Sequence, residues 1–320
     1  MRLFRSALVT GATGFIGSVL VKRLLAEQVE VTCLIRSKHR PTLADSAIRI
    51  IEVPSFDLAT LKTKLAGLSA DAVFNLASFG VQPQDRDPHK LIDGNVGLLT
   101  NLLAATANWP MRRFIHAGSC SEYGPPSAPG VLISENQPLR PTSMYGAAKA
   151  AAFLFGSSFA SHLGVPFLTA RLFGVYGTHE GPQRLIPYIV DRLQQHRPVD
   201  LTLGEQVRDL LFEDDVAEAF IEAAEAEELK FYEAYNVCSA RPVRVRELGE
   251  KVANALNRPQ HLLGWGERPY RADEPMWSVG DNRLFRAATA WRPRTPIEDG
   301  ILRVISSRKE VEQVGERHAV

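Results

Sequence analysis

A tyrosine and a lysine stand one helical turn apart in the segment Ser143-Met-Tyr-Gly-Ala-Ala-Lys, at Tyr145 and Lys149. Side chains four residues apart on a helix lie on the same face. A phenol has a pKa near 10, which must fall by about three for proton exchange near neutrality, and a neighbouring ammonium group favours the phenolate. The spacing is common by chance, but the residue types make this pair a candidate for acid/base catalysis.

Ser119 supplies a third polar side chain upstream of the pair. It follows the segment Arg113–His116, which we predict to be a strand, so its hydroxyl could orient a substrate oxygen beside Tyr145. The surrounding sequence, Gly118-Ser-Cys-Ser-Glu-Tyr-Gly124, also has the composition of an ordinary surface turn. Its chemistry therefore depends on where the fold places it.

Three glycines near the N-terminus, Gly11, Gly14 and Gly17, have the spacing G-x-x-G-x-x-G. They follow the apolar run Ala7–Thr10 and open the amphipathic segment Ile16–Glu27. A tight turn, a backbone that approaches a pyrophosphate and a helix N-terminus that favours anions all suit this arrangement. The context predicts a dinucleotide site, with a purely structural turn as the alternative.

Basic residues occupy the position that usually distinguishes NAD from NADP. An NAD site commonly offers a carboxylate to the ribose 2′-hydroxyl after the second strand. Here the segment Val31–Ile35 is followed by Arg36, Ser37, Lys38 and Arg40. Three cations and a hydroxyl without a nearby acid would accept a 2′-phosphate, so the sequence favours NADP. A solvated basic loop is the alternative, and it leaves NAD open.

Short apolar segments alternate with longer segments of helical period through the first half of the chain. This order is typical of a parallel sheet with helices on both faces, so we expect an α/β fold with a doubly wound, Rossmann-type sheet. Further strands are expected at Ala72–Leu76, Phe167–Leu172 and Tyr235–Val237, and further helices at Leu91–Asn108, Leu185–Gln195, Val216–Glu228 and Val245–Leu256.

The composition changes after Arg171, where pieces rich in Gly, Pro, Arg and aromatic residues separate the helices. We therefore expect a Rossmann dinucleotide-binding domain at residues 1–172 and a smaller α/β substrate-binding lobe at residues 173–320. Helices around residues 207–235 are expected to return to the first domain. The charged tail beyond Ser306 is expected to fray.

Bulk composition narrows the class of protein. The chain has 320 residues and a formal net charge of +1, which provides no overall field to attract nucleic acid or an anionic membrane. Its three cysteines, Cys33, Cys120 and Cys238, lie in unrelated contexts, so neither disulfides nor a metal site is indicated. We expect a cytoplasmic protein without a signal peptide or a membrane span.

The glycine triplet, Ser119, Tyr145 and Lys149 together resemble the extended short-chain dehydrogenase/reductase family, which contains nucleotide-sugar epimerases, dehydratases and reductases. The resemblance extends over almost the whole chain. It also rests on the stretches "FNLAS", "GNVGLLTNLLAAT" with Asn95, "RLFGVYG", "RDLLFEDDVAEAF", "YRADEPMW" and "AWRP".

This resemblance implies a mechanism. Tyr145 would exchange a proton with a substrate hydroxyl or carbonyl, Lys149 would hold the nicotinamide ribose and lower the tyrosine pKa, and Ser119 would hydrogen-bond the reacting oxygen. Hydride would pass between a sugar carbon and nicotinamide. The implied cofactor contacts are Gly11, Thr13, Gly14, Phe15, Ile16, Gly17, Arg36, Leu76, Ala77, Asn95, Tyr145 and Lys149.

The resemblance also implies a nucleotide-diphosphate sugar as the substrate. Paired guanidinium groups suit a diphosphate, and Arg208 and Arg271 would supply them. For Arg208 the alternative is a surface ion pair with Glu213 or Asp214. The implied substrate contacts are Ser119, Ser121, Arg208 and Arg271.

The turn after Ser119 bears on the type of reaction. In the family's 4,6-dehydratases and UDP-glucuronate decarboxylases, an acidic residue lies two positions before the tyrosine of this Tyr-Gly turn. Counting back from Tyr123, that position holds Ser121, and Glu122 is one place out of register. On a strand-like segment one place means the opposite face, which disfavours dehydration and decarboxylation. We expect NADPH-dependent reduction of a nucleotide-linked 4-keto, 6-deoxy hexose, with a 4-epimerase carrying tightly bound NAD as the alternative.

Several positions leave two interpretations open. Cys120 is one place away from the catalytic cysteine of the family's GDP-fucose synthases, and simple packing is the alternative. Gly174 replaces an asparagine that usually touches the substrate in this family. The loop Ser78–Pro88 either contacts substrate through Asp85, Arg86 and Asp87 or forms a solvated turn.

The family also implies a homodimer, in which the helices at Leu91–Asn108 and Tyr145–Leu163 pair across the interface. Phe153, Phe155 and Phe159 would belong to such an interface, and burial within one chain is the alternative. A non-catalytic protein that senses NADP on the same fold is a different class of function, which the intact Ser119, Tyr145 and Lys149 argue against.

Overall fold

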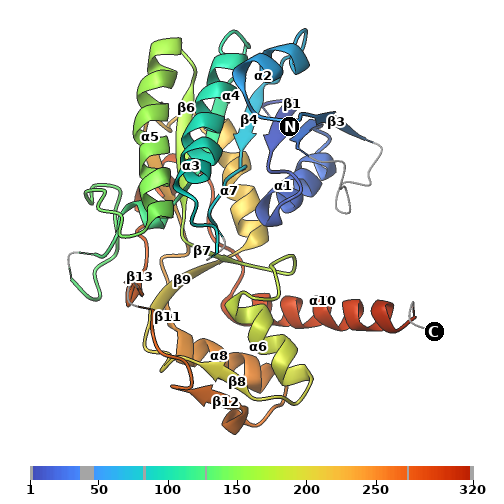
Figure 1. Cartoon of the computed structure of the whole chain (residues 1–320), viewed down its shortest axis with the longest axis vertical. Coiled ribbons are helices and arrows are strands. Elements are labelled where there is room, and N and C mark those ends of the chain that lie inside the picture. The colour runs from blue at the N-terminus through green and yellow to red at the C-terminus, as the bar shows by residue number, and fades with distance from the viewer. Residues whose placement is uncertain (1–2, 37–46, 82–83, 127, 272–273, 318–320) are drawn as a thin grey trace.

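A seven-stranded parallel sheet forms the centre of the larger part of the molecule (Figure 1). The structure is a computed structural model that describes residues 3–36, 47–81, 84–126, 128–271 and 274–317. The strand order is β10-β6-β5-β4-β1-β2-β3. The strands are β1 (Ser6–Thr10), β2 (Glu30–Ile35), β3 (Ile48–Glu52), β4 (Ala72–Asn75), β5 (Arg113–Ser119), β6 (Phe167–Leu172) and β10 (Ala234–Val237).

Helices cover both faces of this sheet because successive strand residues point to opposite faces and both sets are apolar. One face packs against α1 (Phe15–Ala26) and α7 (Glu213–Glu225), and its core includes Phe74 and Phe220. The other face packs against α2 (Leu58–Lys64), α4 (Leu98–Thr106) and α5 (Met144–Leu163), around Phe114 and Phe167. The predicted α/β, Rossmann-type fold is confirmed.

Strand β1 is the point at which the chain order reverses, because it pairs with β2 on one side and β4 on the other. In open parallel sheets, ligands bind outside the carboxyl ends of the strands at such a point. The glycine turn follows β1, the segment from Leu76 follows β4, and Ser119 ends β5. The fold thus brings these three segments to one edge of the sheet.

A second group of elements lies below the sheet in Figure 1. It has its own apolar core, which includes Ile189, Leu193, Val252 and Val304. The elements around this core are α6 (Leu185–Gln194), β8 (Val199–Leu201), α8 (Val245–Ala255), β12 (Leu263–Trp265) and α10 (Ile297–Arg317).

A small sheet connects the two groups. Its central strand β9 (Val207–Phe212) pairs with β7 (Gly174–Tyr176), β11 (Pro242–Arg244) and β13 (Trp277–Ser278). Two short helices, α3 (Pro88–Ile92) and α9 (Arg283–Ala288), complete the described helices of the α type. Strands of two or three residues are too short for an alternating pattern, which explains why the sequence did not predict β7, β8, β11, β12 and β13.

Two expected elements differ in the structure. The helix predicted at Leu91–Asn108 is divided into α3, a π-helical turn at Asp93–Gly97, and α4. The tail beyond Ser306, predicted to fray, continues as the helical backbone of α10 to Arg317. Within the described ranges, no helix combines the length and the apolar character that crossing a membrane requires.

Candidate active site

The turn after β1 leaves no space for a side chain at two of its glycines. Gly11 has a φ of +69°, and a Cβ atom there would lie 2.7 Å from the backbone nitrogen of Ala77. A Cβ atom on Gly17 would lie 2.1 Å from the carbonyl oxygen of Gly11. The Gly14 N–H donates to that same oxygen at 2.9 Å. The turn therefore has the close packing that the spacing predicts.

The N-terminus of α1 is open to an anion. Gly14 occupies the cap position, and no described side chain caps the helix or places an acid in its first turn. Its first N–H groups and its dipole therefore favour negative charge. Thr13 is exposed at this end, and Phe15 and Ile16 are partly buried. These features fit the pyrophosphate of a dinucleotide.

Hydrogen bonds between buried side chains connect the end of β1, just before the glycine turn, to β4 and β5. Thr10 Oγ1 donates to Asn75 Oδ1 at 2.7 Å and accepts the Ala77 N–H at 3.2 Å, and the Asn75 amide contacts His116 Nδ1 at 3.1 Å. Burial, with a smaller contribution from Lys149, holds the pKa of His116 well below its usual range. Neither Thr10 nor Asn75 was assigned a role from the sequence, although a polar residue at the end of an apolar strand was the available signal.

Arg36 is exposed at the carboxyl end of β2, directly after the buried Ile35. It occupies the end of the strand where a dinucleotide-binding sheet meets the adenosine ribose. The other residues of the predicted basic loop, Ser37, Lys38 and Arg40, lie outside the described residues.

The three candidate catalytic residues come from two neighbouring elements. Ser119 is the last residue of β5, and Tyr145 and Lys149 lie one turn apart at the start of α5. The side chain of Ser143 caps this helix by accepting the Gly146 N–H at 3.0 Å. Gly146 is required there, because a Cβ atom would lie 2.3 Å from the carbonyl oxygen of Ser121. The contact between Gly146 and Ser121 holds the start of α5 against the segment that follows Ser119.

The phenol of Tyr145 stays protonated at neutral pH. Burial raises its pKa to about 12, and hydrogen bonding with the side chains of Ser78 and Ser119 opposes this shift. Burial lowers the pKa of Lys149 to about 8, and the charge of Glu122 opposes that shift. The Lys149 ammonium donates to the Ala117 carbonyl at 2.9 Å. Burial thus dominates at Tyr145, and the hydrogen bonds with Ser78 and Ser119 act to lower its pKa. The lowering of this pKa by Lys149 stays a prediction.

Ser78 is a site residue that the sequence did not assign. Its hydroxyl donates to Asn95 Oδ1 at 2.9 Å, and the Asn95 amide donates to the carbonyls of Phe79 and Leu91 at 2.9 and 2.8 Å. Asn95 is buried within the π-helical turn, a local widening that is frequent at functional sites. Asn95 therefore holds the loop that carries Ser78, and its own contact with a cofactor stays a prediction.

The side chain of Glu122 is buried, but the local backbone differs from the strand-like segment that the sequence analysis assumed. The residues Cys120–Glu122 form a 3-10 turn rather than a strand, so alternation of faces does not apply. The side chain of Glu122 returns beneath Ser119, accepts the Ser119 N–H at 2.7 Å and pairs with Arg171 Nε at 2.7 Å. Because it is fully buried in this pair, it is not presented as an acid to a substrate. Ser121 is partly exposed, and its N–H donates to Ser119 Oγ at 3.2 Å.

Arg208 and Arg271 lie close together because both pair with Glu274. Arg271 Nε lies 2.9 Å from Glu274 Oε2, and Arg208 bonds the other carboxylate oxygen. Arg208 does form an ion pair, as the alternative held, but its partner is Glu274. Glu213 bonds Thr178 and His179, and Asp214 pairs with Arg303 at 3.0 Å. The structure brings the two candidate diphosphate ligands together, along with a carboxylate that the sequence did not assign.

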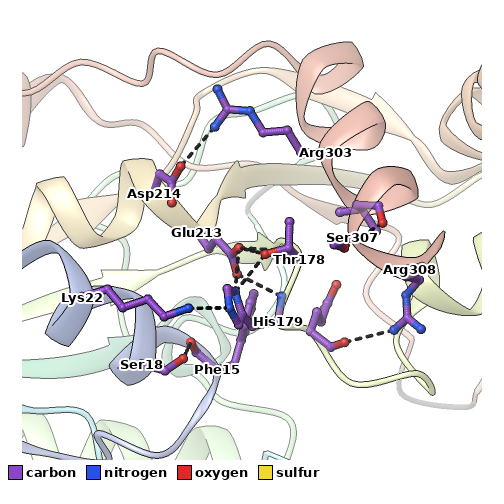
Figure 2. A network of polar contacts seen from close by, with 12 residues as sticks. Phe15, Ser18, Lys22, Thr178, His179, Glu213, Asp214, Arg303, Ser307 and Arg308 are labelled. Atoms are coloured by element: carbon purple, nitrogen blue, oxygen red, sulfur yellow. Dashed lines mark hydrogen bonds and ion pairs between the residues drawn. The ribbon is translucent and has the colours of Figure 1, made fainter. Parts of the chain in front are cut away.

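Glu213 has a different role (Figure 2). It accepts the N–H and the hydroxyl of Thr178 at 2.9 and 2.6 Å and contacts His179 Nδ1 at 3.1 Å. The other ring nitrogen of His179 lies 3.1 Å from the Lys22 ammonium on α1. This network links the loop after β7 to α1 and α7.

Cys120, Asp87 and Gly174, which the sequence left with two interpretations each, have packing or capping roles in the structure. Burial raises the pKa of Cys120 to about 11, and its sulfur accepts the Ser278 hydroxyl at 3.7 Å, so the thiol is not activated. Asp87 caps α3 by accepting the N–H of Lys90 at 3.1 Å. A Cβ atom on Gly174 would lie 2.5 Å from the Asp209 carbonyl, so no side chain fits there without a shift of β9.

The three phenylalanines of α5 do not lie on one surface. Phe153 packs over the Arg171 guanidinium at 4.5 Å, and Phe159 packs against the apolar core. Phe155 is 57% exposed next to Leu154 at 60%. Among the described residues, no group of three or more His, Cys, Asp or Glu side chains is arranged to hold a metal ion.

Comparison with known proteins identifies one matching family model and similar enzymes. A family model described as the NAD-dependent epimerase/dehydratase family matches residues 7–238. A UDP-glucose 4-epimerase from Mycolicibacterium smegmatis is 28% identical over 311 residues, which cover 93% of this chain and 96% of that protein.

Solved structures share the arrangement over nearly the whole chain. The UDP-glucose 4-epimerase of Thermus thermophilus, in complex with NAD, has a TM-score of 0.84 and 26% identity over 95% of this chain and 99% of that one. A dTDP-glucose 4,6-dehydratase from Streptomyces venezuelae, with NAD bound, has a TM-score of 0.85 and 24% identity over 96% and 98% of the two chains. The second likeness concerns the fold alone.

Proposed function

The chain belongs to the NAD-dependent epimerase/dehydratase family, and on that premise we propose that it catalyses hydride transfer at C4 of a nucleotide-diphosphate sugar, in the direction of NADPH-dependent reduction of a 4-keto, 6-deoxy hexose. The observation that carries the direction is Arg36, an exposed cation at the end of β2. A reductase draws on the cellular NADPH pool, whereas an epimerase returns hydride to the same carbon.

The glycine turn fits a dinucleotide, because a Cβ atom at Gly11 or Gly17 would occupy the space that the close turn needs. Residues 1–172 would then hold the cofactor, with α7 and β10 added to that unit, and residues 173–320 would supply most substrate contacts. When bound, the cofactor supplies the hydride. The N–H groups of α1 and the guanidinium of Arg36 would hold its phosphates.

The protein's own part in the reaction is proton transfer and orientation. Because burial keeps the Tyr145 phenol protonated, with a pKa of about 12, it would donate its proton to the C4 oxygen of a ketone. Ser119 and Ser78 would hold that oxygen beside the phenol. Lys149 would hold the nicotinamide ribose through its ammonium group.

Arg208 and Arg271 would hold the diphosphate of the substrate. Arg271 is 61% exposed and Arg208 is 21% exposed, so both guanidinium groups retain surface that a ligand can reach. A diphosphate would share these donors with Glu274 or take them over. Two adjacent guanidinium groups can each donate a pair of hydrogen bonds to phosphate oxygens.

A 4-epimerase with tightly bound NAD is the second candidate, and the 28% identical UDP-glucose 4-epimerase of M. smegmatis favours it. Dehydration is less well supported, because position 121 carries a serine and Glu122 is sealed in an ion pair. We also propose a cytoplasmic homodimer, with the exposed Leu154 and Phe155 in the interface.

Purified protein tests these candidates directly. The proposal expects little cofactor to be released on denaturation, and NADPH to be consumed with a dTDP- or UDP-linked 4-keto-6-deoxy sugar. Release of tightly bound NAD, with interconversion of UDP-glucose and UDP-galactose and no consumption of NADPH, would establish the epimerase instead.

The variant Tyr145→Phe is the matched control for catalysis. General acid catalysis is worth about 10²- to 10⁴-fold, so turnover should fall by that factor while cofactor affinity is retained. A protein that only senses NADP would show no turnover in either form and the same cofactor response in both.

A further inference from the structure

The carboxylate of Glu122 touches the segment that carries the predicted catalytic serine. One oxygen accepts the Ser119 N–H at 2.7 Å, and the hydroxyl of Ser119 accepts the Ser121 N–H at 3.2 Å. Together these bonds form a capping box around the 3-10 turn. The position of Ser119 at the end of β5 therefore depends on where the Glu122 side chain is held.

Arg171 on β6 fixes the other oxygen of that carboxylate at 2.7 Å. Its guanidinium packs against two aromatic rings, with centroids 4.7 Å away for Tyr123 and 4.5 Å away for Phe153. It also donates to the Tyr123 hydroxyl at 2.9 Å, which donates to Asn236 Oδ1 at 2.7 Å. Strands β5, β6 and β10 and helix α5 thus all contribute to holding Glu122 in one place.

Glu122 also places a negative charge near Lys149. The Lys149 ammonium bonds Ala117, two residues before Ser119 on the same strand. Around it lie His116 on β5, Tyr145 on α5 and Glu122 in the turn, with Arg171 on β6 beyond Glu122. Burial keeps His116 and Tyr145 uncharged near neutrality, since the pKa of His116 is lowered and that of Tyr145 is raised. The Glu122 charge therefore favours the protonated form of Lys149.

We propose that Glu122 is a positioning residue of this site: its carboxylate, fixed by Arg171, holds the backbone of Ser119 and supplies a negative charge near Lys149. It acts through these two residues and does not contact the substrate. This role rests on the proposed function only in taking Ser119 and Lys149 as site residues. It explains why a carboxylate, which is costly to bury, occupies the first position before the Tyr-Gly turn.

The test compares Glu122→Gln with the wild-type protein. Glutamine keeps the shape and an oxygen acceptor for the Ser119 N–H but removes the charge. Binding of NADPH, or of NADH if that binds more tightly, is followed by nucleotide fluorescence from pH 6 to pH 10. Loss of one nearby charge is expected to move the alkaline decline in affinity to lower pH by about one unit, and to lower kcat about tenfold with little change in KM.

Glu180→Gln is the matched control. Glu180 is also a buried carboxylate paired with an arginine, Arg184 at 3.1 Å, but it lies in the loop after β7. Its loss should lower thermal stability and leave the pH profile of nucleotide binding unchanged. If Glu122→Gln behaves in the same way, with only a stability loss, the proposal is overturned.

A second variant covers the case in which Glu122→Gln does not fold. The pair Glu122→Met and Arg171→Met removes both charges together, which is often tolerated in a buried site. It should show the same shift of the alkaline decline. An unchanged decline in the folded double variant overturns the proposal. If the wild type binds nucleotide but reduces no keto sugar, the proposed function fails while this comparison still decides the role of Glu122.

Discussion

Two arginine–glutamate clusters belong to the candidate site, and they differ in their access to solvent. The side chains of Arg171 and Glu122 are 2% and 0% exposed. In the other cluster Glu274 is 11% exposed, but its partner Arg271 is 61% exposed. The same residue types therefore stand in two different electrostatic environments.

The difference in solvent exposure indicates two roles: the buried pair has a structural role, and the accessible cluster can bind a ligand. A sealed pair has lost its water, so each charge depends on its protein partner and cannot exchange it without a large penalty. An accessible pair is screened, contributes little to folding, and can exchange its partner for a ligand of the same charge. We infer that the first cluster fixes the geometry of catalysis and the second recognises the substrate.

The largest effect should come from breaking the sealed pair. Replacing Arg171 with Met leaves the buried Glu122 carboxylate unpaired, which should lower the free energy of unfolding by about 3–5 kcal/mol. Urea denaturation measures the change, and Arg271→Met serves as the control. That control should lose less than about 1 kcal/mol because its pair is exposed. Equal losses in the two variants would remove the distinction between the clusters.

Variants of the accessible cluster should lose affinity for the ligand rather than stability. Arg208→Met and Arg271→Met should each weaken binding of UDP or dTDP about 10- to 100-fold, because a hydrogen bond to a charged group is worth about 1.5–3 kcal/mol. Calorimetric titration with the nucleotide gives the affinity. Binding that is unchanged in the double variant would place the diphosphate elsewhere.

Arg36 extends the comparison to an exposed arginine outside both clusters. Arg36→Ala should reduce affinity for NADP about tenfold relative to NAD, without a measurable change in stability, since it loses one charge-assisted contact to a 2′-phosphate. Fluorescence titrations with both nucleotides measure this ratio. Lys62→Ala, which removes an exposed cation on α2, is the control and should leave the ratio unchanged.

The smallest effect concerns the titration of Lys149 inside the sealed region. Its folded pKa of about 8 lies below the ordinary lysine value of 10.5, so between these two values the unfolded chain binds more protons than the folded one. This group therefore makes the protein more stable as pH rises, by about 1 kcal/mol between pH 7 and pH 9. Lys149→Met lacks this contribution. The free energy of unfolding of the variant minus that of the wild type should therefore decrease from pH 7 to pH 9. An increase in this difference with pH would contradict the lowered pKa of Lys149.

Much of the fold follows from patterns that act over short distances. The glycine spacing at Gly11, Gly14 and Gly17 specified a tight turn because only glycine permits the contacts that the turn requires. Buried strands such as β5 and β6 were recognisable as apolar runs. Helical spacing places Tyr145 and Lys149 on one face, and the resemblance to a known family gave the pair its expected role.

Other features depended on contacts between distant parts of the chain. Glu122 was correctly excluded as an acid facing the substrate, but on the wrong local structure, because a 3-10 turn and a short strand look alike in three residues. Its partner Arg171 is remote in sequence and could not be predicted. Arg208 was given the wrong alternative partner, since Glu274 reaches it only through the pairing of β9 with β13. Ser78 became visible only when the loop after β4 was folded against α5.

The close contact at Gly174 sets a limit on redesign. The position cannot simply be exchanged for the asparagine that the family resemblance leads one to expect, because the first side-chain atom would collide with the backbone of β9. Regaining an amide there requires a new separation between β7 and β9, and Arg208 lies on β9. Changing the sugar preference at this point therefore also means moving a predicted diphosphate ligand. Sugar preference and diphosphate binding are coupled through the separation of β7 and β9, and directed evolution would have to alter them together.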